Sequence, residues 1–218
     1  KIGDVLLDQG NLGEALESYR ASMAVRERLA RSDPSNAGWQ RDLSISHDRI
    51  GDVLRAQGNL GEALKSYRAA MAVAERLARS DPSNAGWQYD LGISHERIGS
   101  VLQAQGDLSN ALKAFYTKRE IIERLARSDP GNAGWQRELS VSHSKIGDVL
   151  LDQGNLGEAL ESYRASMAVA ERLARSDPGN AGWQRDLSVS HNKIGDVLLD
   201  QGNLGEALES YRASMAVR

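Results

Sequence analysis

The feature that most constrains this chain is an internal repeat with a period of 48 residues. An isoleucine–glycine pair recurs at that spacing, at Ile2, Ile50, Ile98, Ile146 and Ile194. Self-similarity at a fixed period of roughly 20–50 residues is typical of repeat architectures. We therefore expect one array rather than a compact globule. Its units are predicted at 1–48, 49–96, 97–144 and 145–192, with a partial unit at 193–218.

Each period is predicted to hold two helices separated by two kinds of break. Proline ends the second helix, because it lacks an N–H group and clashes with the preceding turn. Asn36 is placed to cap a first helix over residues 37–57, which continues into the second period. Gly58 suits the left-handed position that ends this helix. Asn59 and Glu62 then have the spacing of a capping box for the second helix.

The second helix carries apolar residues every three or four positions, which predicts one buried face. In the second period these residues are Leu60, Ala63, Leu64, Tyr67, Met71, Ala74 and Leu77. Gly51 lies within the first helix, where glycine costs about 1 kcal/mol relative to alanine. We expect this cost to be offset by the close approach of a neighbouring helix backbone.

These residues resemble the tetratricopeptide repeat, whose pattern is W-x2-L-G-x2-Y, A-x3-F and P over about 34 residues. Ile50-Gly51 stands at the L-G, Ala63 and Tyr67 at the A-x3-F, and Pro82 at the P, whereas His47 replaces the tryptophan. Each helix is about seven residues longer than in the family, which is about two turns and keeps the apolar face in register. The resemblance implies an all-α solenoid of stacked antiparallel helix pairs, wound as a right-handed superhelix.

Composition excludes several classes of function. A net charge of −3 gives no electrostatic case for binding nucleic acid. The absence of cysteine excludes disulfides, thiolate metal sites and a cysteine nucleophile. No apolar run approaches the roughly 18 residues of a membrane span, so we expect a cytoplasmic protein. The histidines and the Ser44–His47 pairing recur once per repeat, which predicts structural roles, with no metal, no cofactor and no enzymatic activity.

The resemblance also implies a function, because tetratricopeptide arrays line a concave groove with the first helix of each repeat. We therefore expect a protein-interaction scaffold that binds a peptide or helix on this face. The candidate partner-binding residues are Arg41, Asp48, Asp52, Tyr89, Glu96, Arg137, Arg185, Asn192 and Asp196. Aspartate stands where the family's clamp for C-terminal carboxylates has asparagine, which favours a polar or basic partner. A solvated face without a ligand is the alternative.

The third repeat departs most from the others. It places Lys113, Tyr116, Lys118 and Arg119 on the second helix, where the other repeats have glutamate or lysine, arginine, serine or alanine, and methionine, respectively. Two interpretations stay open at this point. The four residues form a basic–aromatic patch for a specific partner, or they are drift compensated by Ile122, which replaces a small alanine.

The runner-up function is a structural, self-associating array, or an engineered consensus array without a dedicated ligand. Residues 1–26 are identical to residues 193–218. We expect apolar side chains to be exposed at both ends of the array, with Ile2, Val5 and Leu6 at one and Leu208, Tyr211 and Met215 at the other. Contact between two such different surfaces is head-to-tail and can propagate into filaments.

Overall fold

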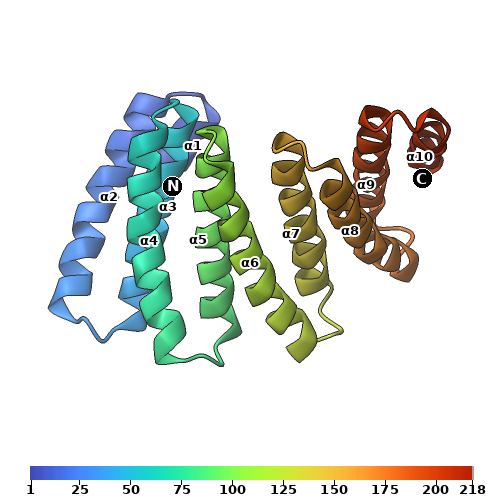
Figure 1. The fold of residues 1–218 in the computed structure, drawn as a ribbon. Coiled ribbons are helices and arrows are strands. Elements are labelled where there is room, and N and C mark those ends of the chain that lie inside the picture. The colour runs from blue at the N-terminus through green and yellow to red at the C-terminus, as the bar shows by residue number, and fades with distance from the viewer. Residues whose placement is uncertain (218) are drawn as a thin grey trace. The chain divides into compact units, whose positions relative to one another are not determined.

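The computed structural model describes residues 1–217, and all the regular elements in that range are helices (Figure 1). There are ten in the described chain: α1 (Ile2–Asp8), α2 (Leu12–Ser32), α3 (Ala37–Ala56), α4 (Leu60–Ser80), α5 (Ala85–Ala104), α6 (Leu108–Ser128), α7 (Ala133–Asp152), α8 (Leu156–Ser176), α9 (Ala181–Asp200) and α10 (Leu204–Ala216). We call the odd-numbered helices the first helices of the repeats and the even-numbered ones the second helices. From here on, a repeat is one such pair of helices, from α1–α2 as the first repeat to α9–α10 as the fifth. The helices pack sequentially in pairs, which confirms the predicted all-α repeat fold.

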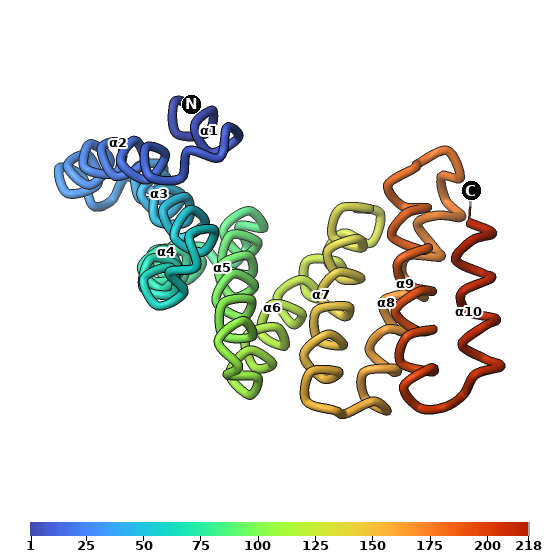
Figure 2. Tube along the Cα trace, turned by 90° about the horizontal axis from the view of Figure 1, so that it is seen from above, coloured from blue at the N-terminus to red at the C-terminus, as the bar shows by residue number. Residues whose placement is uncertain are grey.

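The chain divides into two compact units, whose boundary falls inside α6 between Ala114 and Phe115. In the first unit, α1 packs against α2, α2 against α3, α3 against α4, and α4 against α5. In the second unit, α7 to α10 do the same, as the trace in Figure 2 shows. The 48-residue unit boundaries and their union into one array remain predictions.

The breaks between repeats follow from local side-chain chemistry. The side chain of Asn36 accepts a hydrogen bond from the backbone N–H of Trp39 at 3.1 Å, which confirms the predicted cap of α3. The equivalent asparagines cap α5, α7 and α9 in the same way. Ahead of this cap, Asp33 accepts hydrogen bonds from the backbone and the hydroxyl of Ser35, which fixes the turn around Pro34.

The break within each repeat is a left-handed glycine. Gly58 has φ +77°, and its N–H donates to the carbonyl of Arg55, while the N–H of Asn59 donates to the carbonyl of Leu54. This pair of bonds satisfies the last carbonyls of α3. The predicted capping box is wrong. The Asn59 side chain donates instead to Gln57 at 3.3 Å, and Glu62 accepts from Lys65 at 2.7 Å, so both side chains are used elsewhere.

The cores of the repeats other than the third, which has Phe115 at the tyrosine position, are built around a glycine and a tyrosine. A Cβ placed on Gly51 would lie 2.5 Å from Cε1 of Tyr67, whose side chain is 1% exposed. The same approach occurs between Gly3 and Tyr19, Gly147 and Tyr163, and Gly195 and Tyr211. The close approach predicted for the glycine is therefore present, but its partner is a tyrosine ring and not a helix backbone. The ring fills the space because glycine has no side chain.

We expect Gly51→Ala to destabilise the protein by about 1–3 kcal/mol, because the new methyl group overpacks against the Tyr67 ring. Gly61→Ala is the matched control, since nothing lies within 4 Å of a Cβ at that helical position. The control should be neutral or more stable by up to about 1 kcal/mol through helix propensity. Chemical denaturation measures both changes, and equal effects at the two sites would contradict this packing.

Candidate partner-binding surface on the first helices

Neighbouring first helices are joined by bidentate ion pairs. In the first unit, Arg41 of α3 donates through Nε and Nη2 to the two carboxylate oxygens of Asp90 on α5, at 2.5 and 3.1 Å. In the second unit, Arg137 of α7 pairs with Asp186 of α9 at 2.6 and 3.2 Å. Both arginines were expected to face a partner, and the structure holds each of them against the next repeat.

A second set of ion pairs runs in the opposite direction along the chain. Arg97 of α5 lies 2.7 Å from Asp48 and 3.4 Å from Asp52, both on α3. Lys193 of α9 pairs with Asp148 of α7 in the same way. Asp52 also accepts a hydrogen bond from the Tyr67 hydroxyl at 2.7 Å, and Asp148 accepts one from the Tyr163 hydroxyl at 2.8 Å. Asp52 is therefore engaged within the fold.

The cations of these pairs also lie over the tyrosine rings. The guanidinium carbon of Arg97 is 5.9 Å from the ring centroid of Tyr67, and Nζ of Lys193 is 5.2 Å from that of Tyr163. These distances allow a cation–π attraction of about 0.5–1 kcal/mol. Burial and the nearby carboxylates raise the pKa of both tyrosines, so each phenol stays protonated and continues to donate.

Asp48 is the most unusual carboxylate of this surface. Its side chain is 13% exposed, and its Oδ1 has no hydrogen-bond partner in the described chain. Burial raises the pKa of Asp48 to about 6, with smaller contributions from Asp52 and Asp90, while Arg97 opposes the shift. Asp48 was expected to contact a partner, but it lies mostly beneath the surface.

Each unit has a groove between its two complete first helices. The α3–α5 groove has a volume of about 310 Å³ and is lined by Arg41, Ile45, Asp48, Arg49, Tyr89, Asp90 and Arg97, among others. The α7–α9 groove, at the equivalent positions, has a volume of about 190 Å³ and is lined by residues that include Ser140, Ser144, Lys145, Asp148, Asp186 and Lys193. These are two copies of one site with different linings.

The charge that the grooves expose is mainly positive. In the Arg41–Asp90 pair the arginine side chain is 48% exposed and the aspartate 28%. Lys145 lines the α7–α9 groove and forms no ion pair within residues 1–217. The basic partner expected from the sequence remains a prediction, and within these grooves carboxylates such as Asp90 and Asp186 are already paired with cations of neighbouring repeats.

The other candidate residues of the first helices have varied surroundings. Tyr89 is half-buried and lines the α3–α5 groove, and Glu96 is half-buried on the same helix. Arg185 and Asn192 are exposed on α9. Asp196 is exposed as well and accepts a hydrogen bond from the Tyr211 hydroxyl at 2.7 Å. The sequence analysis missed Arg49, Arg97, Lys145 and Lys193, although a cation before every isoleucine–glycine pair was visible.

The predicted basic–aromatic patch of the third repeat is not a single exposed surface. Lys113 is exposed, and Tyr116 is half-buried with the Arg119 guanidinium 4.9 Å from its ring centroid. Arg119 also lies 3.4 Å from Glu123. Lys118, in contrast, is 0% exposed and pairs with Glu138. The buried Ile122 is consistent with compensated packing changes in this helix.

The histidines do not gather into a group of metal ligands in the part of the chain that the structure describes. Burial lowers the pKa of His47, His95 and His143, which keeps these side chains neutral near pH 7. Within residues 1–217, no three potential ligands among His, Cys, Asp and Glu converge.

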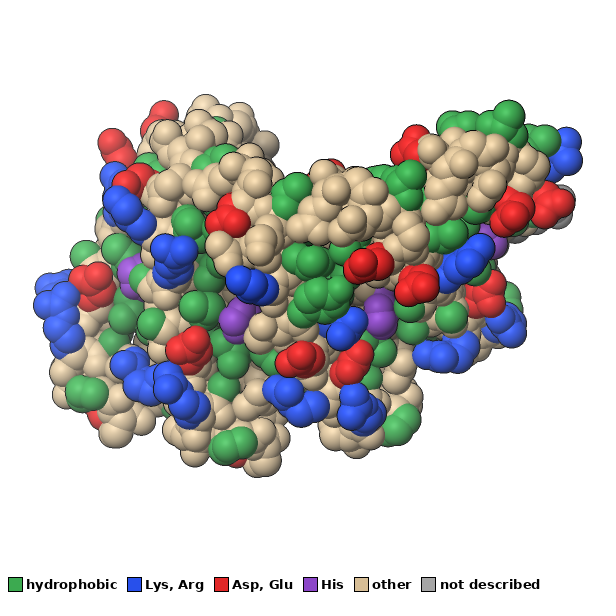
Figure 3. Space-filling model, in the orientation of Figure 1, with side chains coloured by type: hydrophobic (Ala, Val, Ile, Leu, Met, Phe, Trp, Pro, Cys, Tyr) green, Lys and Arg blue, Asp and Glu red, His purple; other side chains and the backbone are tan. Residues whose placement is uncertain are grey.

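Acidic and basic side chains are interspersed on the face in Figure 3. The described helices are each too short or too polar to cross a membrane.

Comparisons with known proteins agree with this architecture. A family model described as tetratricopeptide repeat matches residues 1–34 and 48–82. The nearly identical TPR-like repeats of a putative kinesin light chain from Podosopora anserina are similar in structure, with a TM-score of 0.67 and 20% identity over 99% of this chain and 92% of that one. Apo RapI gives a TM-score of 0.73 and 12% identity over 99% of this chain and 51% of that one.

MamA is also similar, with a TM-score of 0.55 and 16% identity over 99% of this chain and 93% of that one. At such identities the likeness to solved structures shows the fold alone. No curated protein sequence is significantly similar to this chain.

The raised pKa of Asp48 makes stability depend on pH. Between an unfolded value of about 3.9 and the folded value of about 6, the native state binds the extra proton, so the free energy of unfolding falls as pH rises through that window. As pH rises from 4 to 7, we expect the free energy of unfolding of the Asp48→Asn variant to increase by about 1–2 kcal/mol relative to that of the parent protein. Denaturation curves at each pH measure the difference, and parallel pH profiles would contradict the shift.

Proposed function

We propose that the chain is an α-helical scaffold of the tetratricopeptide type, which binds other proteins through the first helices of its repeats. The observation that carries this proposal is the pair of equivalent grooves, α3–α5 and α7–α9, which are both lined by side chains of first helices. Tetratricopeptide scaffolds are typically used for protein–protein interaction.

The lining of the grooves favours an extended or helical peptide with acidic side chains. Arg41 and Arg49 are about half-exposed, and Lys145 contributes an unpaired cation to the α7–α9 groove. Ser144 adds a hydroxyl group that can donate to carboxylate or carbonyl oxygens. Opposite charges across an interface mainly raise the association rate and the specificity. Binding of such a peptide should weaken as salt rises.

End-to-end association of copies is the second candidate. Leu208 is 49% exposed, whereas its counterpart Leu64 is 9% exposed beneath a neighbouring helix. Met215, Ile2 and Val5 are exposed too. The exposed apolar faces of α1 and α10 can cover each other in two copies, which is the head-to-tail contact of the self-associating alternative.

We expect a fluorescently labelled, glutamate-rich helical peptide to bind more tightly than a lysine-rich one of equal length. Lys145→Glu should weaken binding of the glutamate-rich peptide at least about fivefold, because it replaces an attractive charge by a repulsive one. Fluorescence anisotropy at two salt concentrations measures this effect.

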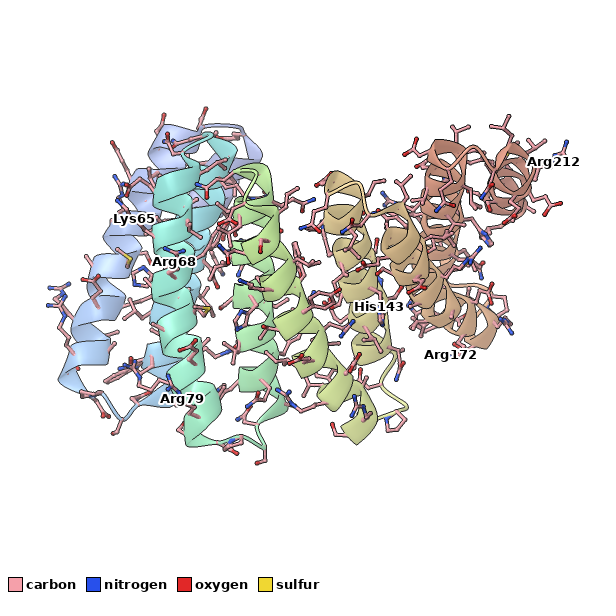
Figure 4. All side chains as sticks on the ribbon, in the orientation of Figure 1. Lys65, Arg68, Arg79, His143, Arg172 and Arg212 are labelled. Atoms are coloured by element: carbon pink, nitrogen blue, oxygen red, sulfur yellow. The ribbon has the colours of Figure 1, made fainter. Side chains whose placement is uncertain are left out.

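Lys65→Glu is the matched control, because Lys65 is exposed on the second helix α4 (Figure 4) and outside both grooves. Tighter binding of the lysine-rich peptide, or equal effects of the two substitutions, would contradict the proposed groove. Sedimentation of the protein alone over a concentration series separates partner binding from end-to-end association.

A further inference from the structure

Near-identical repeats create a problem of register. The second helices α2, α4 and α8 pack against the first helices α3, α5 and α9 of the following repeats, and they do so with equivalent residues. These shared apolar contacts do not specify which first helix follows which second helix. Exchange of equivalent elements between copies is a low-cost route to swapped dimers. Misassembly of this kind is also a characteristic failure of repeat proteins.

One buried ion pair is different from all the other contacts between repeats. Nζ of Lys118 on α6 lies 2.9 Å from Oε2 of Glu138 on α7, and the lysine side chain is 0% exposed. Both residues are unique at their positions in the repeat. The counterparts of Lys118 are Ser22, Ala70, Ser166 and Ser214, and those of Glu138 are Asp42, Asp90 and Asp186.

A second change accompanies this pair within the third repeat. In the fourth repeat, Ser140 of α7 donates a hydrogen bond to the carbonyl of Ser166 at 2.9 Å, and in the fifth repeat Ser188 of α9 donates one to the carbonyl of Ser214 at 3.2 Å. In the third repeat the position of Ser140 is held by Gly92, which has no hydroxyl to donate. The third repeat thus has a glycine at the position of the serine that donates this bond, and Lys118 of its second helix forms a charged bond to the next repeat.

The energetics of burial make the pair selective. A buried charge without a partner costs several kcal/mol, whereas a well-formed buried pair adds little net stability over a well-packed apolar contact. An aspartate in place of Glu138 is one methylene shorter, and a serine or alanine in place of Lys118 leaves the glutamate without its cation. We propose that the Lys118–Glu138 pair fixes the register of the array, so that α6 packs only against α7 of the same chain.

Charge reversal tests this proposal directly in the full chain. Lys118→Glu places two carboxylates together, and Glu138→Lys places two ammonium groups together, so each variant alone has a repulsive α6–α7 contact. When the two variants are refolded together, exchange of α7 between chains restores an opposite-charge pair at both contacts. We expect the mixture to contain at least fivefold more dimer than either variant alone, measured by sedimentation velocity.

The control is the exposed pair Arg137–Asp186, reversed in the same way by Arg137→Asp and Asp186→Arg. Mixing these two variants should produce no additional dimer, because exposed pairs are worth little. The double reversal Lys118→Glu with Glu138→Lys in one chain should be as monomeric as the parent protein. If the single variants do not fold alone, recovery of helical circular dichroism in their mixture supports the proposal. A mixture that shows neither dimer nor recovery overturns it.

Discussion

The contact on which the rest of the structure depends is the packing of a tyrosine ring against a glycine, which occurs in the repeats other than the third. Tyr67 occupies the space that a side chain on Gly51 would need, and its hydroxyl donates to Asp52. The same arrangement occurs at Tyr19, Tyr163 and Tyr211. Asp52 and its equivalent Asp148 also bind a cation from the next repeat. Packing inside one repeat is thereby linked to the position of the next.

This link decides what the first helices can offer to a partner. The carboxylates that look like a ligand-binding series in the sequence are used between repeats, and Asp48 is buried with its pKa raised to about 6. What remains accessible is mainly cationic, because Arg41 is half-exposed and Lys145 has no carboxylate partner among the described residues. The groove and the joints between repeats are thus formed by the same helices, and their chemistry cannot be changed independently.

Much of the fold could be predicted from the sequence because it depends on local chemistry. Asn36, Gly58 and Pro34 act within a few residues of their own positions, and the structure agrees with each of them. The ion pairs join residues about one repeat apart, so no local pattern indicates that Asp52 and Arg97 meet. The burial of Lys118 depends equally on a neighbouring helix. The sequence contains one signal of the contact between Asp52 and Tyr67. At the equivalent positions of the third repeat both residues differ together, as Ser100 and Phe115.

A double-mutant cycle on this pair tests the central claim most directly. Tyr67→Phe and Asp52→Ser introduce the residues found at positions 115 and 100, and each should lower the free energy of unfolding by about 1–2 kcal/mol, because each removes the hydrogen bond between the Tyr67 hydroxyl and the Asp52 carboxylate. The double variant should cost at least about 1 kcal/mol less than the sum of the two single changes. Additivity within about 0.3 kcal/mol would contradict the claim that the tyrosine and the aspartate act as one unit.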